Sequence, residues 1–475
     1  MKDFNLLIDG RLVPGATTMT VLNPATEAVL AEIPRADMAQ LNAAVAAAKK
    51  AFKAWSARPL RERGALLGKL ADALEARQDE FARLLTEEQG KPLPQAQHEI
   101  AGAVGMMRYF ASLDLPFKTL KDNDTQTLFE QRTPLGVVAA ITPWNYPLLL
   151  LVIKVAPALL AGNTMVAKPA PTTPLTTLRL GELCAELLPP GVVNIITDQN
   201  DLGGALTSHP DVAKVAFTGS TATGRKVMES VAPSLKRLTL ELGGNDAAVV
   251  LDDVDPKEVA PKLFAGATIN SGQVCLAIKR LYIHDSMYDV ICDELAKLAR
   301  EAIVDDGMKQ GTQLGPLQNK AQFEKVKEFI EDARRNGKII AGGEALSRKG
   351  YFIAPTIVRD IPDDARLVRE EQFGPVLPVL RYSDVNDAIA RANDTDYGLG
   401  ATVWSSNPDR ALEVARQLDA GVVWINTHLD ITPDMPMAGA KQSGHGAELG
   451  QQGLEEYTQL KIINAAKVPV GNVPA

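Results

Sequence analysis

The chain has 475 residues, enough for two or three domains, and its 46% hydrophobic and 23% charged residues are typical of an ordinary globular protein. A formal net charge of -8, with no basic run to offset it, would repel phosphate backbones, so we expect no nucleic-acid partner. No zinc-type spacing of Cys and His occurs, which predicts no metal site.

The first residues indicate a short strand, a turn and a second strand, with no pattern of a signal peptide. The odd number of cysteines (Cys184, Cys275 and Cys292) then favours reduced thiols and a cytoplasmic location. Residues 59–89 carry apolar side chains at helical spacing. In this predicted helix Pro59 suits the first turn and Gly90 suits the C-cap.

A hairpin is predicted at residues 117–134, which break the helical pattern, and residues 457–463 form a strand that could pair with it. Projecting strands leave open edges, and a second subunit is the simplest cover for them. We therefore expect a homodimer or a tetramer. The apolar run 147–161 is interrupted by Lys154 and Pro157 and is too short to span a bilayer, so it indicates a buried helix and no membrane partner.

From Gly136 onward, short β-rich runs alternate with helical stretches, which predicts βαβ units and a parallel, doubly wound sheet. A second alternating series begins at about Asp252 and predicts a second α/β domain. The runs assigned to the first series are 136–142, 164–168, 192–196, 214–219 and 247–251.

Cys275 is the cysteine with the features of a nucleophile. It follows the polar segment 270–273, and a flexible polar loop at a helix end would provide the access and the lowered thiol pKa that a nucleophile needs. Cys184 and Cys292 lie in amphipathic helical patterns and are predicted to be inert core residues. No histidine base lies near Cys275 in the sequence, since the closest, His284, follows the next strand, and this disfavours a cysteine hydrolase.

Two polar residues at strand ends complete the candidate chemistry. Glu241 ends an apolar run before a Gly-Gly turn, where it is either a solvated turn residue or a general base that deprotonates water. Asn145, in TPWNYP, follows the strand 136–142, at the edge where α/β sheets bind ligands. Its amide suits an oxyanion and the flanking prolines would hold it rigidly, although an ordinary asparagine in a proline-rich turn is the simpler alternative.

The segment 217–226, FTGSTATGRK, predicts a phosphate-binding turn. Gly219 and Ser220 lie between a strand and a helix, where exposed N–H groups suit a diphosphate. The segment is neither GxGxxG nor Walker A, because Arg225 stands where a lysine must follow the second glycine. Lys168 ends another strand and could reach a nucleotide ribose.

Taken in order, the segments PWNYP, KPAPTTP, FTGSTATG, ELGGN, GQVC, EQFGPV and KQSGHGAELG resemble the aldehyde dehydrogenase superfamily over nearly the whole chain. This resemblance implies that Cys275 attacks an aldehyde to form a thioester, that Asn145 and the main-chain N–H of Cys275 bind the oxyanion, and that Glu241 activates the hydrolytic water. Lys154 and Glu448 match positions that help to relay protons from the base.

The resemblance also implies NAD or NADP as the cofactor, with NAD slightly preferred. Lys168 would contact the adenosine ribose, Ser220 the diphosphate and Glu371 the nicotinamide ribose, with Phe373 beside the ring. Many NAD-preferring relatives carry a glutamate where this chain has Pro171, so we expect relaxed cofactor choice. The implied cofactor contacts are Thr142, Pro143, Trp144, Lys168, Pro171, Gly219, Ser220, Leu242, Glu371 and Phe373.

By resemblance the substrate tunnel is almost wholly apolar, which favours a medium-sized aliphatic or aromatic aldehyde. Asp430 is its one charged neighbour, and an aminoaldehyde is the alternative that it would attract. A CoA-acylating enzyme is a further alternative, but acylating relatives generally lack the counterpart of Glu241. The family's usual PFGG is here 436–439, PMAG, which alters the tunnel border. The implied lining residues are Tyr146, Leu150, Ile153, Val274, Leu276, Asp430, Ile431 and Met437.

The predicted fold class is therefore α/β, with a Rossmann-like cofactor domain, a second α/β catalytic domain and a small β oligomerisation arm. The expected limits are 1–116 and 135–246 for the cofactor domain, 247–445 for the catalytic domain, and 117–134 with 446–475 for the arm and C-terminal segment. A non-catalytic protein on this fold remains an alternative, but it would not need Cys275, Glu241 and Asn145 together.

Overall fold

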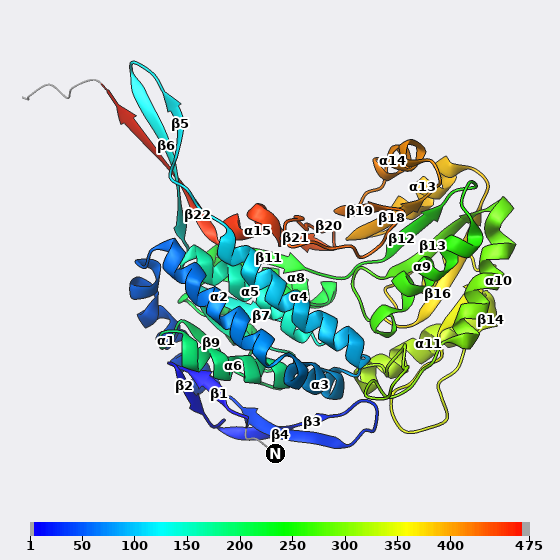
Figure 1. The fold of residues 1–475 in the computed structure, drawn as a ribbon, viewed down its shortest axis with the longest axis horizontal. Coiled ribbons are helices and arrows are strands. Elements are labelled where there is room, and N and C mark those ends of the chain that lie inside the picture. The colour runs from blue at the N-terminus through cyan, green and yellow to red at the C-terminus, as the bar shows by residue number, and fades with distance from the viewer. Residues whose placement is uncertain (1–3, 468–475) are drawn as a thin grey trace, which may run out of the picture.

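The computed structural model describes residues 4–467 and confirms the α/β class: two sheets flanked by helices lie side by side, with a β arm projecting from one of them (Figure 1). In the first sheet the central strands are parallel, and their order reverses between β7 and β10, the kind of switch point where open α/β sheets bind ligands. From edge to edge the strands are β2 (Arg11–Val13), β1 (Leu6–Ile8), β9 (Val193–Ile195), β8 (Thr164–Lys168), β7 (Val137–Ile141), β10 (Val212–Thr218), β11 (Arg237–Glu241) and β21 (Gly444–His445).

Each face of the first sheet packs against its own set of helices, because successive strand residues point to opposite faces. Val138 and Ala140 pack with α2 to α6, whereas Val137, Ala139 and Ile141 pack with α1, α7 and α8. The helices are α1 (Met38–Ser56), α2 (Leu60–Ala76), α3 (Gln78–Gln89), α4 (Leu93–Ser112), α5 (Pro147–Ala161), α6 (Leu175–Leu187), α7 (Gly203–Ser208) and α8 (Thr221–Val231).

Two predicted helices have different outcomes. The buried helix expected over 147–161 is confirmed as α5. The single helix expected over 59–89 is wrong: it is two helices, α2 and α3, broken at Arg77, where φ is -113° and ψ is 18°. Both helices bury their apolar faces in the same core, so the hydrophobic period continues across the break and does not reveal it. Pro59 is the N-cap of α2 rather than a first-turn residue, and Gly90 caps α3 with φ of 99° as predicted.

The second sheet is also largely parallel, and Cys292 lies in its core, as Cys184 lies in the core of the first. The run 247–251 was grouped with the first series, which is wrong, because it forms β12 between β13 and β18 in the second sheet. The strands are β14 (Lys338–Ala341), β15 (Thr356–Arg359), β16 (Val376–Tyr382), β13 (Ile278–His284), β12 (Asp246–Val250), β18 (Gly400–Trp404) and β19 (Val422–Ile425).

Helices α9 and α10 cover one face of this sheet, and α11, α12, α13 and α14 cover the other. None of the helices formed by residues 4–467 is long and apolar enough to cross a membrane. The bounds are α9 (Pro256–Thr268), α10 (Asp285–Glu301), α11 (Lys320–Asn336), α12 (Arg366–Arg369), α13 (Val385–Asn393) and α14 (Pro408–Ala415), and α15 (Gly450–Glu455) follows near the first sheet. Short pairs form from β3 (Thr17–Leu22) with β4 (Val29–Arg35) and β17 (Tyr397–Gly398) with β20 (Ala440–Lys441).

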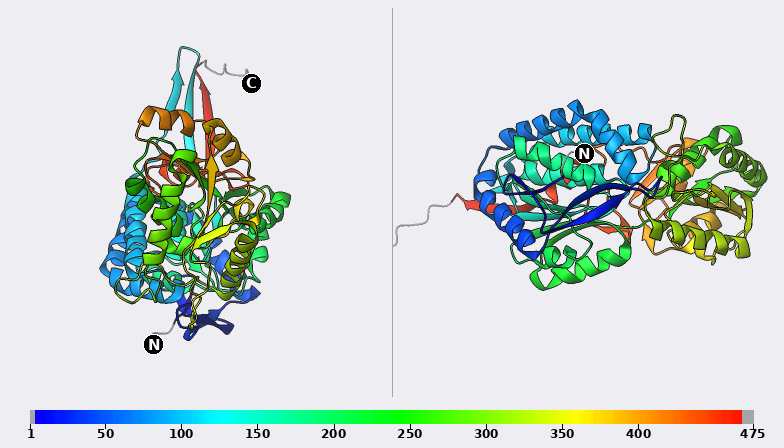
Figure 2. Two further views of the ribbon diagram at one scale, coloured as in Figure 1. Left: turned by 90° about the vertical axis from the view of Figure 1, so that its right-hand side faces the viewer. Right: turned by 90° about the horizontal axis from the view of Figure 1, so that it is seen from below.

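The predicted arm is present. The hairpin is formed by β5 (Lys118–Asp122) and β6 (Gln126–Pro134), and the pairing of the C-terminal strand with it is confirmed by β22 (Thr458–Ala466). All three strands project beyond the body of the molecule (Figures 1 and 2). The limits proposed for the three domains stay a prediction.

A glycine contact joins the two halves of the chain beside the site described below. A Cβ atom on Gly315 would lie 1.9 Å from the carbonyl oxygen of Gly90, so the two main chains touch without room for a methyl group. The main-chain carbonyl oxygen of Gly315 accepts a hydrogen bond from the Ser271 hydroxyl at 2.8 Å. The backbone at Gly90 therefore sets how closely the loop before Cys275 approaches the first sheet.

Candidate active site

A cavity of about 770 Å³ lies at the carboxyl ends of β7, β8 and β10, where the strand order reverses. Its volume is within the range of sites for small molecules and cofactors. Asn145 and Cys275 line it, together with every residue predicted to contact the cofactor: Thr142, Pro143, Trp144, Lys168, Pro171, Gly219, Ser220, Leu242, Glu371 and Phe373. It is also lined by polar residues that the sequence did not point to, among them Asn200, Thr207, Lys226, Ser230, Asn319, Gln322 and Lys325.

The phosphate-binding turn has the predicted local structure. Ser220 is the N-cap of α8, and its hydroxyl accepts a hydrogen bond from the main-chain N–H of Thr223 at 3.3 Å. Gly219, Ser220 and Thr223 bring the N-terminus of α8 to the cavity wall, where the helix dipole favours an anion. The residues present thus fit a diphosphate at this end of the cavity.

The loop before Cys275 is buried and hydrogen-bonded, which disagrees with the flexible polar loop expected from the sequence. Asn270 and Ser271 have φ of 50° and 55°, in the left-handed region that non-glycine residues rarely adopt, and each is buried. The Gln273 side chain is also buried, and its oxygen accepts a hydrogen bond from the Gln318 N–H at 2.8 Å. The polar side chains of this segment turn inward and hold the backbone instead of facing solvent.

The thiol of Cys275 is not acidic in this environment. Burial raises its pKa to about 12, and the nearby charge of Lys279 acts in the other direction. Glu371, Glu241 and Asp246 add to the increase. The lowered thiol pKa expected from the sequence is therefore wrong, because desolvation outweighs the charge of Lys279.

Glu241 ends β11 as predicted, but it is only 6% exposed, so the alternative of a solvated turn residue is wrong. Its Oε1 has no hydrogen-bond partner among residues 4–467. Burial and the neighbouring Glu448 hold the pKa of Glu241 well above its usual range, while Lys154 opposes them. A carboxylate with a raised pKa and a bare oxygen has the chemistry of a proton acceptor.

Lys154 and Glu448 lie together behind Glu241, although they come from α5 and from the C-terminal segment. Nζ of Lys154, fully buried, lies 2.5 Å from Oε1 of Glu448 and 2.7 Å from the hydroxyl of Thr218. The main chain of Glu448 exchanges hydrogen bonds of 2.8 Å with Met437, which joins this ion pair to the segment 436–439. The arrangement can pass a proton between buried acids and a lysine.

Asn145 is held by contacts from both halves of the protein. Its amide nitrogen donates to the carbonyl oxygen of Gln273 at 2.9 Å, two residues before Cys275. The main-chain carbonyl oxygen of Asn145 accepts hydrogen bonds from Nζ of Lys91 at 2.9 Å and from the side-chain amide of Asn270 at 3.1 Å. An amide nitrogen carries two hydrogens, so Asn145 can donate a second hydrogen bond to an oxyanion near the thiol.

Lys91 and Glu99 were missed in the sequence. Lys91 is fully buried, 2.5 Å from Oε2 of Glu99, and lies 3.5 Å from the ring centroid of Tyr146. The other oxygen of Glu99 accepts hydrogen bonds from the first N–H groups of α5, at Leu148 and Leu149. Lys91 lies just before α4 and Glu99 lies within it, whereas Asn145 lies before α5. Only the folded chain brings these residues together, so no local sequence pattern connects them.

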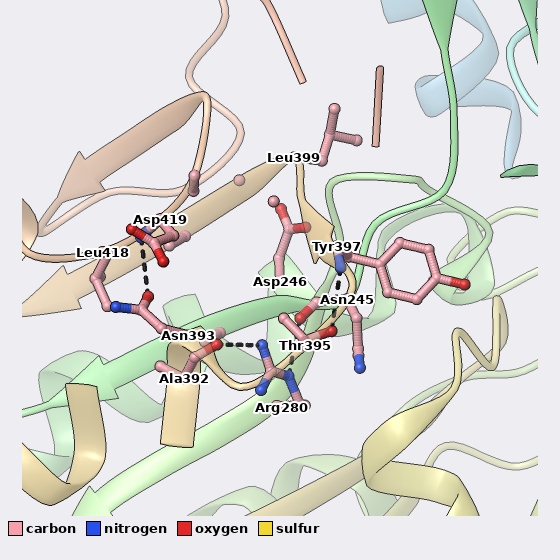
Figure 3. Close-up of a pocket in the computed structure, with 15 residues that line it drawn as sticks. Asn245, Asp246, Arg280, Ala392, Asn393, Thr395, Tyr397, Leu399, Leu418 and Asp419 are labelled. Carbon is pink, nitrogen blue, oxygen red and sulfur yellow. Dashed lines mark hydrogen bonds between the residues drawn. The ribbon is translucent and has the colours of Figure 1, made fainter. Parts of the chain in front are cut away.

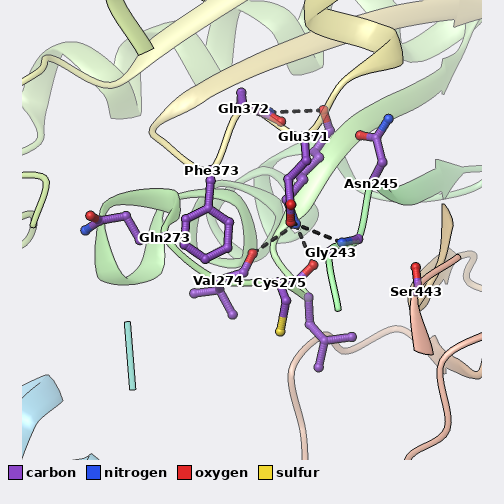
Figure 4. Close-up of polar contacts among 12 residues, drawn as sticks. Gly243, Asn245, Gln273, Val274, Cys275, Glu371, Gln372, Phe373 and Ser443 are labelled. Carbon is purple, nitrogen blue, oxygen red and sulfur yellow. Dashed lines mark hydrogen bonds and ion pairs between the residues drawn. The ribbon is translucent and has the colours of Figure 1, made fainter. Parts of the chain in front are cut away.

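A loop of the second half carries Glu371 and Phe373 at the cavity wall (Figure 4). Oε1 of Glu371 accepts a hydrogen bond from Gly244 N–H at 3.1 Å and lies 3.6 Å from Nζ of Lys279. The ring of Phe373 meets Trp144 edge to face, with 5.3 Å between centroids. Side chains from both halves of the chain therefore line one cavity.

Apolar side chains surround Cys275 on the side predicted for the substrate. Of the predicted lining, Tyr146, Val274, Leu276, Ile431 and Met437 share a cluster with Cys275, whereas Leu150 and Ile153 pack in the core around α5. Asp430 is exposed, and its carbonyl accepts a hydrogen bond of 2.9 Å from the Trp424 indole. The sequence did not single out the further cluster members Ile269, Leu399, Trp424, Leu429 and Met435.

A second, small cavity of about 20 Å³ lies behind the site and is lined by Asn245, Asp246 and Arg280 (Figure 3). It has room for a water molecule and not for a substrate. Burial raises the pKa of Asp246 to about 8, and Lys279 opposes this increase. Nowhere in residues 4–467 do three acidic, histidine or cysteine side chains gather in a way that could hold a metal ion.

Comparison with known proteins agrees with this geometry. Residues 13–463 match the model of the aldehyde dehydrogenase family. The phenylacetaldehyde dehydrogenase of Pseudomonas fluorescens is 42% identical, with 96% of this chain and 95% of that protein covered. The structure of the NAD⁺ complex of an aldehyde dehydrogenase from Bacillus cereus superposes with a TM-score of 0.96 at 38% identity, over 98% of this chain and 97% of that one.

An NADP-dependent enzyme of E. coli has a structure that superposes with a TM-score of 0.95 at 37% identity, and the two chains cover 98% of each other. The family match covers most of the sequence. It agrees with the fold, with the order of the strands around the cavity and with the position of Cys275 in that cavity. The chain belongs to the aldehyde dehydrogenase family.

Proposed function

We propose that this NAD(P)⁺-dependent aldehyde dehydrogenase oxidises a medium-sized apolar or aromatic aldehyde to the carboxylic acid through a thioester on Cys275. The observation that supports it is the apolar cluster around Cys275, in which Tyr146, Trp424 and Met435 supply large side chains. Each methylene group that a substrate buries there contributes about 0.8 kcal/mol. None of the residues predicted to line the substrate tunnel is an arginine or a lysine, so a second carboxylate on the substrate would be buried there without a cationic partner.

In this proposal Cys275, as the thiolate, attacks the aldehyde carbon. The negative charge that develops on the substrate oxygen is stabilised by the Asn145 amide and by the main-chain N–H of Cys275. One such donor typically contributes roughly 3 kcal/mol to the barrier. Lys91 and Gln273 hold Asn145 in place from opposite sides, so little reorganisation is needed when the charge forms.

The residues around the cavity suit the cofactor. The N-terminus of α8 with Ser220 would hold the diphosphate, Lys168 the adenosine ribose and Glu371 the nicotinamide ribose. When bound, the nicotinamide ring accepts the hydride that leaves the substrate carbon. Trp144 and Phe373 line this end of the cavity, where their rings meet edge to face.

Hydrolysis of the thioester then requires a base, and Glu241 has the position and the raised pKa for it. Water adds to the thioester carbon and gives its proton to Glu241, and the sulfur of Cys275 leaves as the acid forms. The buried pair of Lys154 and Glu448 would carry the proton away from Glu241. Because water completes the cycle, CoA is not required as an acceptor.

The test is a panel of aldehydes assayed through the absorbance of reduced nicotinamide, with NAD⁺ and NADP⁺ and with and without CoA. Phenylacetaldehyde, benzaldehyde and hexanal should have higher kcat/KM than acetaldehyde or succinic semialdehyde. Cys275→Ala should abolish oxidation, whereas the matched Cys292→Ala, in the core of α10, should retain it. If succinic semialdehyde ranks first, the apolar site is refuted. Turnover that depends on CoA would instead indicate an acylating enzyme.

An aminoaldehyde is the second candidate, because Asp430 is an exposed acidic residue whose main-chain carbonyl accepts a hydrogen bond from Trp424, a member of the apolar cluster. A cationic substrate would gain from this carboxylate only at the outer end of the site. If an aminoaldehyde has the highest kcat/KM and Asp430→Asn removes that advantage while leaving hexanal unchanged, the second candidate replaces the first.

A further inference from the structure

Lys279 is a buried lysine whose hydrogen bonds go to the main chain of the nucleophile loop. Its side chain, at the start of β13, is about 2% exposed. Nζ donates to the carbonyl oxygen of Val274 at 2.9 Å and to that of Cys275 at 2.5 Å. A charged lysine is rarely buried unless it has partners, so its place behind the main chain of Cys275 requires an explanation.

Acidic groups on separate elements face this lysine and the thiol. Glu371, in the loop that lines the cavity, lies 3.6 Å from Nζ of Lys279, and Asp246 on β12 is within electrostatic reach of it. Glu241 approaches the thiol from the end of β11, and the phenol of Tyr146 does so from the loop before α5. Figure 4 shows Val274, Cys275 and Glu371 converging on one point of the site.

We propose that Lys279 is a positioning residue for Cys275: it holds the main chain of the nucleophile loop and supplies the positive charge that favours the thiolate, in opposition to Glu371. The inference rests on the proposed function, in which Cys275 is the nucleophile. When the thiolate forms, the thiol proton passes to water in the open cavity.

The electrostatic directions agree with the geometry. Lys279 lowers the pKa of the Cys275 thiol, whereas Glu371 raises it. Glu371 also lines the cofactor cavity, so a group that donates hydrogen bonds to its carboxylate weakens its repulsion of the thiolate. The ion pair between Lys279 and Glu371 thereby links the reactivity of the Cys275 thiol to any group that binds the Glu371 carboxylate.

The test measures the thiol directly. The rate at which iodoacetamide alkylates Cys275 is followed against pH in the full-length protein without added cofactor, with the labelled Cys275 peptide quantified by mass spectrometry. Lys279→Gln keeps an N–H donor and removes the charge. It should raise the thiol pKa by about one unit and slow labelling at a fixed pH about tenfold. Glu371→Gln should change both in the opposite direction, and Lys279→Arg should restore most of the parent rate.

Lys262→Gln, which removes one charge from the exposed face of α9, is the matched control and should change neither. An unchanged thiol pKa in a folded Lys279→Gln protein would overturn the inference. If the Lys279→Gln protein does not fold, the Glu371→Gln protein provides the test. A slower or unchanged alkylation rate of Cys275 in Glu371→Gln would also overturn the inference. Oxidation that survives in Cys275→Ala would refute the proposed function itself, which separates the two failures.

Discussion

Nζ of Lys168 lies 2.5 Å from Oδ1 of Asp198, and the two side chains are 4% and 0% exposed. The other oxygen of Asp198 accepts a hydrogen bond from the N–H of Leu202 at 2.8 Å. The charge of Lys168 is therefore balanced by a carboxylate within the protein, so Lys168 offers little uncompensated charge to a 2′-phosphate. Lys226, exposed at the same cavity wall, is a more available cation.

Cofactor choice should be relaxed, with NAD⁺ preferred and NADP⁺ used. Pro171 lines the cavity and can neither bind ribose hydroxyls nor repel a phosphate. Pro171→Glu should lower kcat/KM for NADP⁺ by about tenfold or more through like-charge repulsion, and leave NAD⁺ equal or better. Steady-state kinetics with both cofactors measure this, and Pro171→Gln controls for the change of shape. An equal loss for both cofactors would mean that position 171 does not face the ribose.

Glu241→Gln should slow thioester hydrolysis more than hydride transfer, because only the water step requires a base. A burst of reduced nicotinamide followed by very slow turnover is expected in stopped-flow absorbance. Burial and Glu448 raise the pKa of Glu241, so the ionised base becomes more abundant as pH rises. Steady-state turnover of the parent enzyme should accordingly increase with pH, and the variant should lose this dependence. A missing burst would show that Glu241 also activates the thiol.

Lys91→Met should destabilise the protein by about 3–5 kcal/mol, since it leaves Glu99 as a buried charge without its partner. It also removes one of the two hydrogen bonds to the main-chain carbonyl oxygen of Asn145 and leaves the one from Asn270, so kcat should fall more than KM rises. In the double variant Lys91→Met, Glu99→Gln no buried charge is left unpaired, and the neutral amide can still accept from the start of α5. Thermal unfolding should show that the double variant is more stable than Lys91→Met alone; a less stable double variant would contradict this.

We predict a homodimer or a tetramer in solution. The arm exposes large apolar side chains on both the hairpin and β22, namely Phe117, Leu120, Leu460 and Ile462, each roughly half accessible. Light scattering of the parent protein should give the mass of two or four chains, and Leu460→Lys with Ile462→Lys should reduce it. Leu412→Lys, an exposed apolar residue on α14, is the control. A monomeric parent at micromolar concentration would refute the prediction.

The sequence predicted those parts of the fold that depend on local pattern. Alternating strands and helices identified the α/β class. The apolar run 147–161 indicated the buried helix α5, and the arm was predicted where residues 117–134 break the helical pattern. The break at Arg77 was not visible, because the apolar period continues through it. At the site, the motifs located Cys275, Glu241 and Asn145, but the thiol pKa depends on burial and on Lys279, which only the folded chain brings together.

The contact of Gly90 with Gly315 has a consequence for how the enzyme can vary. Gly90 precedes Lys91, which holds Asn145, and the carbonyl of Gly315 holds Ser271 in the loop before Cys275. Gly90 and Gly315 therefore affect the distance between the Asn145 amide and the sulfur of Cys275, although neither glycine contacts these groups. A single methyl group at position 315 would push the halves apart at that point, so we expect alanine there to impair catalysis although every reacting group is retained.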